Sequence, residues 1–155
     1  MKLTGSVNYA IGILLQVVLG AEESPLTAAR IARGCRFPPR FLYRILRRLV
    51  DAGLLEGTSG PGGGYRLAKS LKAITLFDVV AAVDAPPEPS RLRPVKASHQ
   101  PAIDRVNKVC AASAEQFTRD LRGLKLADLM TAQKKPKGKP AKKRRAAKSK
   151  VAKRR

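Results

Sequence analysis

The sequence predicts a mainly α-helical fold with a small β wing, namely a winged helix-turn-helix followed by a long C-terminal helix. Three observations lead to this class. Residues 30–48 carry seven arginines and no acidic residue. A glycine-rich tip, residues 60–64, then joins two short runs with strand character. Apolar residues recur every three or four positions from about residue 101 to residue 124, which is the period of an amphipathic helix.

Two helices are expected before the arginine-rich one. The first spans about residues 5–19, where apolar side chains recur at helical spacing, and Gly20 stops it. Thr27 caps a short second helix over residues 28–33, and Gly34 ends that helix. The apolar positions of the first helix are Val7, Ile11, Leu14, Leu15 and Val18.

The third helix and the wing follow directly. Pro38 and Pro39 open the helix, because N–H groups in a first turn lack partners within the helix anyway. Gly53 closes it. Residues 54–58 and 65–68 are expected to form short strands, joined by glycines that adopt positive φ without a Cβ clash. The apolar stripe of the helix consists of Leu42, Ile45, Leu46 and Leu49.

The second half of the chain contains three further helices. Thr75, with Asp78 three residues later, forms a capping box that starts the fourth. Prolines then mark an irregular connector before a helix over residues 101–124 and a short helix over 126–131. The expected organisation is a winged helix-turn-helix domain at 1–85, a connector at 86–100, a dimerisation helix with a short terminal helix at 101–132, and a disordered basic tail at 133–155.

The helix from residue 101 is expected to dimerise the protein. A proline-rich connector limits how far this helix can fold back, so part of its apolar face stays uncovered in one chain. Long terminal helices usually bury such a face against a second subunit, and a symmetric dimer suits a palindromic DNA site. The expected interface residues are Ile103, Val106, Cys110, Phe117 and Leu121.

The charge of the chain favours a polyanionic partner. Its 155 residues carry a formal net charge of +21, from 32 Lys+Arg against 11 Asp+Glu. Residues 134–155 contribute +13 and the other residues +8, so both parts are basic on their own. The tail cannot bury a core, and we expect it to be disordered and to bind DNA without sequence preference. The alternative is a solubilising extension without a role.

The arginine-rich segment is expected to contact DNA. Its arginines repel one another unless a polyanion neutralises them, whereas an ordinary solvated face, the alternative, mixes both signs. Arg40 and Arg44 are the expected base readers, because an arginine forks onto guanine O6 and N7, and the others would fix register through phosphates. The glycine loop lacks the Gly-Lys-Ser/Thr ending of a P-loop, so a phosphate-contacting wing is favoured over a nucleotide cradle or a purely structural turn. The expected contacts are Pro39, Arg40, Tyr43, Arg44 and Arg47 on the helix, and Ser59, Gly62 and Gly63 at the wing.

Neither catalysis nor metal binding is indicated. His99 is the only histidine, and no Ser/His/Asp, HExxH or CxxC pattern exists. Cys35 and Cys110 are too few for a disulfide framework, which favours a reducing cytoplasm. Both cysteines are expected to be packing residues, with a sensing role for Cys110 as the less favoured alternative. The apolar stretch at residues 7–19 is shorter than the roughly 20 residues that span a bilayer.

Five segments of the chain resemble the Rrf2 family of bacterial winged-helix transcription regulators. They cover about residues 1–132 and read MKLTGSVNYAIGILL, PLTAARIARGCRFPPRFLYRILRRLVDAGLL, GPGGGYRL, ITLFDVVAAVDAP and LKLADLM. The resemblance implies a homodimer with a long crossing helix, a palindromic operator, and DNA contacts from the third helix and the wing.

The chain departs from the family pattern at two places. Members that bind an iron–sulfur cluster carry three cysteines after the fourth helix, whereas residues 85–109 contain none and only Cys110 follows. Members often have an acidic residue where Tyr43 stands, and an arginine is common where Ser59 stands. Two Cys110 thiolates per dimer are too few for an all-cysteine site, and His99 is the alternative further ligand. We therefore expect no cluster, and an operator that differs from those of well-known members.

The sequence thus predicts a cytoplasmic, nucleoid-associated homodimer that regulates transcription by binding a specific site in double-stranded DNA. It is not expected to be an enzyme, and no metal or cofactor is expected. The alternative is an architectural, nucleoid-compacting protein in which the basic tail supplies most of the binding.

Overall fold

The computed structural model describes residues 3–23, 25–35, 38–86, 88–89 and 91–133. Arg36 and residues 134–155, most of the expected tail, lie outside this part of the chain. The described residues form six α-helices and one two-stranded antiparallel sheet, which confirms the predicted fold class. In chain order the elements are α1 (Gly5–Leu19), η1 (Ala21–Glu23), α2 (Ala28–Cys35), α3 (Pro39–Asp51), β1 (Leu55–Thr58), β2 (Gly64–Leu67), α4 (Leu76–Val83), η2 (Ala97–His99), α5 (Gln100–Gly123) and α6 (Leu126–Gln133).

The hydrophobic core is built on the packing of α1 against α3, α2 and α4. The predicted stripe of α3 is confirmed, since its four residues are all at most 2% exposed. The inward face of α1 differs from the predicted one. Ala10, Ile13 and Val17 are buried, whereas Ile11 and Val18 are only half-buried. Because α1 is apolar around most of its circumference, its sequence pattern did not determine which face lies innermost.

The predicted end of the second helix is wrong, since α2 continues through Gly34 to Cys35. A Cβ atom on Gly34 would lie 2.3 Å from Oε1 of Gln16 in α1. The missing side chain therefore makes room for Gln16, and Gly34 serves the close packing of α1 and α2 instead of ending the helix.

Both predicted ends of α3 are confirmed. Pro39 is its first residue and follows Pro38. At the other end Gly53 has a φ of 64° and follows the last cap position. The Gly53 N–H donates to the Val50 carbonyl and the Leu54 N–H to the Leu49 carbonyl, each at 2.9 Å. This pair of hydrogen bonds is the Schellman motif that ends many helices at a glycine.

The wing is an antiparallel hairpin of β1 and β2, within one residue of the predicted strands. Glu56 lies opposite Arg66, and its Oε2 is 2.7 Å from the Arg66 Nη2. A third segment, which local sequence patterns do not predict, extends this sheet. Leu26 and Tyr65 each donate their N–H to the other's carbonyl at 2.9 Å, which ties the start of α2 to the wing.

The predicted capping box of the fourth helix is confirmed. The Asp78 N–H donates to Oγ1 of Thr75 at 3.2 Å, and the Thr75 N–H donates to Oδ2 of Asp78 at 2.8 Å. Both donors belong to the first turn of α4, where the helix supplies no acceptor of its own.

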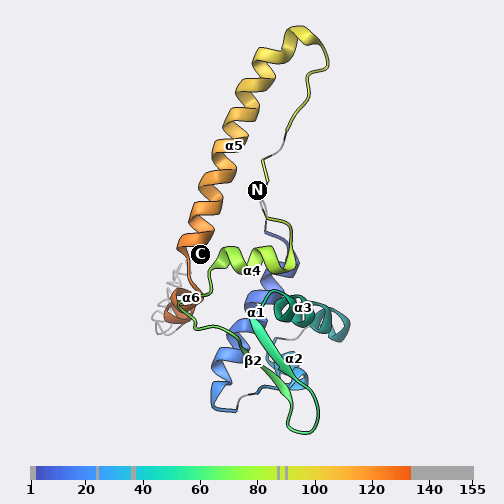
Figure 1. Ribbon diagram of the computed structural model, residues 1–155, viewed down its shortest axis with the longest axis vertical. Helices are drawn as coiled ribbons and strands as arrows, with labels where there is room; N and C mark the ends of the chain where they lie inside the picture. The colour runs from blue at the N-terminus through green and yellow to red at the C-terminus, as the bar shows by residue number, and fades with distance from the viewer. Residues whose placement is uncertain (1–2, 24, 36–37, 87, 90, 134–155) are drawn as a thin grey trace, which may run out of the picture.

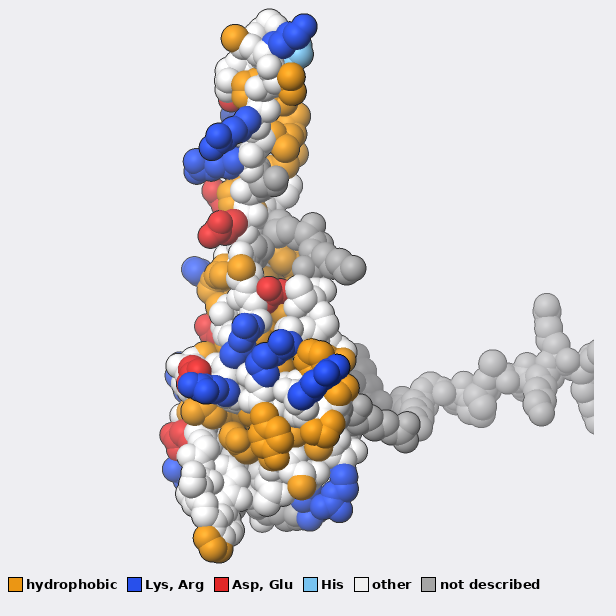
Figure 2. Space-filling view, turned by 90° about the vertical axis from the view of Figure 1, so that its right-hand side faces the viewer, with side chains coloured by type: hydrophobic (Ala, Val, Ile, Leu, Met, Phe, Trp, Pro, Cys, Tyr) orange, Lys and Arg blue, Asp and Glu red, His pale blue; other side chains and the backbone are white. Residues whose placement is uncertain are grey.

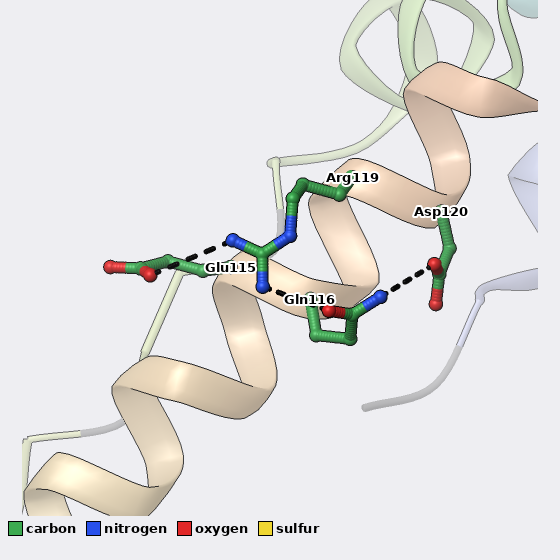
Figure 3. A network of polar contacts seen from close by, with 4 residues as sticks. All are labelled: Glu115, Gln116, Arg119 and Asp120. Carbon is green, nitrogen blue, oxygen red and sulfur yellow. Dashed lines mark hydrogen bonds and ion pairs between the residues drawn. The ribbon is translucent and has the colours of Figure 1, made fainter.

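After α4 the chain leaves the globular part, turns at η2 and returns as the long arm α5 (Figure 1). Asn107 fastens the connector to this arm, because its side-chain amide donates to the Leu92 carbonyl at 3.0 Å and accepts from the Leu92 N–H at 2.8 Å. Towards the base of the arm, a network of polar contacts joins Glu115, Gln116, Arg119 and Asp120 (Figure 3).

The base of α5 and the start of α6 belong to the same core as the first four helices. Leu121 and Leu126 are 4% and 2% exposed. The Leu76 N–H donates to the Leu124 carbonyl at 2.8 Å, and the Leu126 N–H donates to the Ile74 carbonyl at 2.9 Å. No helix in the described ranges is both long enough and apolar enough to cross a membrane.

Arg48 links α3 to α4. Its Nη1 donates a hydrogen bond to the carbonyl of Val83, the last residue of α4. A cation at this position also lies at the end of the helix where the dipole is negative, which adds to the attraction. Arg48 of α3 is therefore fixed to a neighbouring helix by its side chain.

We predict that Arg48→Ala lowers the free energy of unfolding by about 1–2 kcal/mol, because a partly buried carbonyl loses a charged donor. Arg47→Ala is the matched control, since the Arg47 side chain is 85% exposed and its ion pair with Asp51 is long, at 3.9 Å. Its loss should change stability by less than about 0.5 kcal/mol. Urea denaturation at one protein concentration measures both values. Equal stability of the two variants would show that the contact with Val83 contributes nothing.

Candidate nucleic-acid interface

The outward face of α3 carries the predicted helix contacts. Pro39, Arg40, Tyr43, Arg44 and Arg47 are all exposed. Figure 2 looks onto the side of the molecule where α3 lies and shows a row of basic side chains across the globular part, directly beside a hydrophobic patch. The segregation follows from the sequence, because the apolar stripe of α3 turns the opposite face of the helix to solvent.

Two of these arginines lie over an aromatic ring. The guanidinium carbons of Arg40 and Arg44 are 5.3 and 4.9 Å from the centre of the Phe41 ring. Tyr9 of α1 lies against the same ring, with the centroids 6.2 Å apart. A cation is attracted to a ring face without being neutralised by it. Phe41 therefore orients both guanidinium groups and leaves their charge available.

The remaining arginines of α3 differ from each other. Arg47 is highly exposed, and its 3.9 Å contact with Asp51 is a weak surface ion pair. Arg48 is held by the Val83 carbonyl, as described above. All four arginines of α3 are thus exposed, and Arg48 also donates a hydrogen bond to another helix.

The wing tip is shaped by its glycines. Gly60 and Gly62 have φ values of 96° and 77°, which confirms the predicted use of positive φ. Gly63 has a different constraint, since a Cβ there would lie 2.2 Å from the Thr58 carbonyl oxygen. Ser59 and Gly62 are exposed and Gly63 is half-buried. The tip therefore presents backbone with little side-chain cover, which permits a close approach to another molecule.

An open groove of about 550 Å³ separates α3 from the wing. It brings together four of the eight predicted contact residues, namely Tyr43, Arg47, Ser59 and Gly63. Pro39, Arg40, Arg44 and Gly62 lie outside its lining. The other lining residues come from the start of α2 and the residue before it, the end of α3, the two strands and the wing tip, namely Thr27, Ala28, Val50, Gly57, Thr58, Gly60, Gly64 and Tyr65. The sequence predicted that Gly60 and Gly64 belong to the wing tip, whereas the position of Thr27 and Ala28 depends on the pairing of Leu26 with Tyr65.

The predicted interface residues of α5 are unequally exposed within one chain. Val106 is 44% exposed, and Ile103, Cys110 and Phe117 are half-buried. Leu121 is 4% exposed and packs in its own core, so little of it is available to a second chain. Val109, which lies on the same half of the arm as Val106, is 66% exposed.

The two cysteines lie on different elements. Cys35 ends α2 and packs against the core, where burial raises the pKa of its thiol above the usual value. Cys110 lies in the middle of α5 and is half-buried. Within the described ranges, no group of three or more His, Cys, Asp or Glu residues is placed to hold a metal ion.

Together, a helix-turn-helix with an arginine-lined second helix and a glycine-tipped hairpin define the winged-helix class of DNA-binding proteins. The chain belongs to the Rrf2 family, since the family model described as "Iron-dependent Transcriptional regulator" matches residues 3–132. This confirms the resemblance seen in the sequence.

Two named relatives are transcription regulators. IscR of Vibrio campbellii, an HTH-type transcriptional regulator, is 37% identical over 84 residues, which cover 54% of this chain and 50% of IscR. YwgB of Bacillus subtilis, which also carries the name of an HTH-type transcriptional regulator, is 37% identical over 84 residues that cover 54% of each chain. The chain thus spans about half the length of the curated relatives it matches.

Solved structures share the fold. CymR, the global cysteine regulator of B. subtilis, superposes with a TM-score of 0.66 at 22% identity, over 85% of this chain and 98% of CymR. IscR of T. potens gives a TM-score of 0.61 at 20% identity, over 86% of this chain and 88% of IscR. At these identities the likeness establishes the winged-helix architecture, including the long C-terminal helix.

Proposed function

We propose that the chain is a homodimeric regulator that binds a specific site in double-stranded DNA through α3 and the wing. The observation that carries this function is the arginine-lined face of α3, whose single acidic residue is Asp51 at its last position, beside a glycine-tipped hairpin. An α-helix fits the major groove of B-DNA, and a hairpin next to it can follow the phosphate backbone.

Different arginines of α3 are suited to contact base edges and phosphates. Phe41 holds Arg40 and Arg44 in defined positions near the start of α3. A preoriented guanidinium loses less freedom on binding, which favours the two-bond contact with guanine O6 and N7. Arg47, Ser59 and Gly63 line the groove and are suited to phosphate contacts, one through charge and the others through short or absent side chains.

The arm supports a homodimer. Val106 and Val109 expose apolar surface on the half of α5 that is farthest from the core, and a second copy could cover it. The base of the arm instead carries the polar contacts of Figure 3. Two copies related by a twofold axis would present two α3 helices, which matches a palindromic operator.

The regulator is proposed to work without an iron–sulfur cluster, although the family description names iron. Its two cysteines are Cys35, which is packed in the first domain, and Cys110 on the arm. An all-cysteine cluster needs four thiolates. Two copies of Cys110 would supply two, and the raised pKa of Cys35 disfavours its thiolate form.

An architectural DNA-binding protein is the second candidate, favoured only by the +13 charge of residues 134–155. The two functions differ in the ratio of affinities for a selected site and for random DNA at physiological salt. A regulator should show a ratio of about 10³ or more, and a compacting protein a ratio near one.

Arg44→Ala is expected to weaken binding to the selected operator by about 1–3 kcal/mol and to relax the preference at one or two base pairs, because a bidentate guanine contact is lost. Fluorescence anisotropy with operator and random duplexes measures both effects. A loss of equal size on the two duplexes would identify Arg44 as a phosphate contact.

A charge on the exposed half of the arm should separate the subunits. We predict that Val109→Glu shifts sedimentation from dimer to monomer, because two buried like charges would face each other across the twofold axis. Glu115→Ala, which lies on the polar base of the same helix, is the control and should stay dimeric. Monomer in the unmodified protein, or dimer in Val109→Glu, would contradict the proposed interface.

Anaerobic reconstitution with iron and sulfide should leave the purified protein colourless and its affinity for the operator unchanged. The reason is the shortage of thiolate ligands described above. The measurement is the visible absorption spectrum, with an operator titration before and after treatment. An absorption band that disappears in Cys110→Ala would instead establish a cluster.

A further inference from the structure

Tyr43 is the only aromatic residue among the strongly exposed large hydrophobic side chains of the described ranges. It lies in the middle of α3 with 59% of its surface exposed. Within the same ranges, neither a hydrogen bond nor a stacked ring or guanidinium engages it, since the nearby Arg40 and Arg44 lie over Phe41 instead. The exposed part of the ring is therefore available to a binding partner.

Tyr43 has apolar neighbours in a groove whose lining also includes the polar side chains of Thr27, Thr58 and Ser59. It lines the groove together with Ala28, Val50 and Tyr65, and Figure 2 shows a hydrophobic patch beside the basic row. Among the described residues that line the groove, Arg47 is the only charged one. This patch differs from the remainder of the outward face of α3, where arginines predominate.

The chemistry of this patch fits one feature of a base pair. In the major groove every base edge offers hydrogen-bond donors or acceptors, but only thymine adds an apolar group, its C5-methyl. An aromatic ring among apolar side chains gains free energy when it removes such a methyl from water. A phosphate contact would use the Tyr43 hydroxyl alone and would leave the ring and its apolar neighbours in water.

We propose that Tyr43 recognises a thymine in each half of the operator by packing its ring against the C5-methyl group. The inference rests on the proposed function and deepens it, since it assigns to Tyr43 a base contact in place of the phosphate contact expected from sequence. The selected thymine lies next to the base pairs that face Arg40 and Arg44, because Tyr43 occupies the same helix face one turn from Arg40 and adjacent to Arg44.

The test removes the methyl group and the ring separately. An operator is first obtained by in vitro selection from random duplexes with the full chain. Each thymine is then replaced by uracil, one symmetric pair of positions at a time, and affinities are measured for the unmodified protein, Tyr43→Phe and Tyr43→Ala. Tyr43 is exposed, so the variants should fold, and thermal unfolding verifies this.

One pair of positions should be sensitive to uracil, with a loss of about fourfold per methyl group in the unmodified protein. Tyr43→Phe is the matched control, since it keeps the ring, and it should retain this preference for thymine. Tyr43→Ala should bind the thymine and uracil operators equally.

Four results would count against the inference or against the proposed function on which it rests. If no thymine is sensitive to uracil, or if Tyr43→Ala keeps the full sensitivity, the methyl contact is absent and only the proposed role of Tyr43 fails. If Tyr43→Phe loses as much affinity as Tyr43→Ala on operator and random DNA alike, the hydroxyl binds phosphate. If selection enriches no sequence, the proposed function itself fails.

Discussion

Four apolar side chains of α3 are buried to at least 98% against α1 and its neighbours, and this packing determines what the other face of the helix can do. Because Leu42, Ile45, Leu46 and Leu49 form the buried face of α3, its four arginines must lie on the solvent-facing side of the helix or at the border between the two faces. Burying such side chains stabilises a fold by about 1.5–3 kcal/mol each, far more than repulsion among exposed cations costs. The free energy gained by burying the apolar face of α3 therefore exceeds the cost of gathering positive charge on its exposed face.

The fold holds three of these four arginines in place without acidic partners. Arg40 and Arg44 lie over Phe41, and Arg48 donates to the Val83 carbonyl. Ring faces and carbonyl oxygens attract a guanidinium but do not cancel its charge as a carboxylate would. The protein thus orders its cationic side chains while it preserves the electrostatic attraction on which a polyanionic partner depends.

Local signals in the sequence predicted most elements correctly. The capping box of Thr75 and Asp78 and the stripe of α3 depend on residues a few positions apart, so periodicity and spacing were sufficient. The role of Gly34 was misjudged, because it is fixed by a side chain of another helix. Likewise, the contact of Arg48 with Val83 joins residues 35 positions apart. At the candidate site, the exposed face of α3 could be predicted from periodicity. The opposite side of the groove could not, because it depends on how the wing pairs with the segment before α2.

The pairing of Glu56 with Arg66 has a consequence for how helix and wing would share DNA binding. These two are the only charged residues of the hairpin from Leu55 to Leu67, and their ion pair leaves it without net charge. Contacts from the wing tip would therefore release few counterions, whereas each arginine of α3 on a phosphate would release about one. The salt dependence of the overall affinity would then arise mainly from the arginines of the helix and very little from the hairpin.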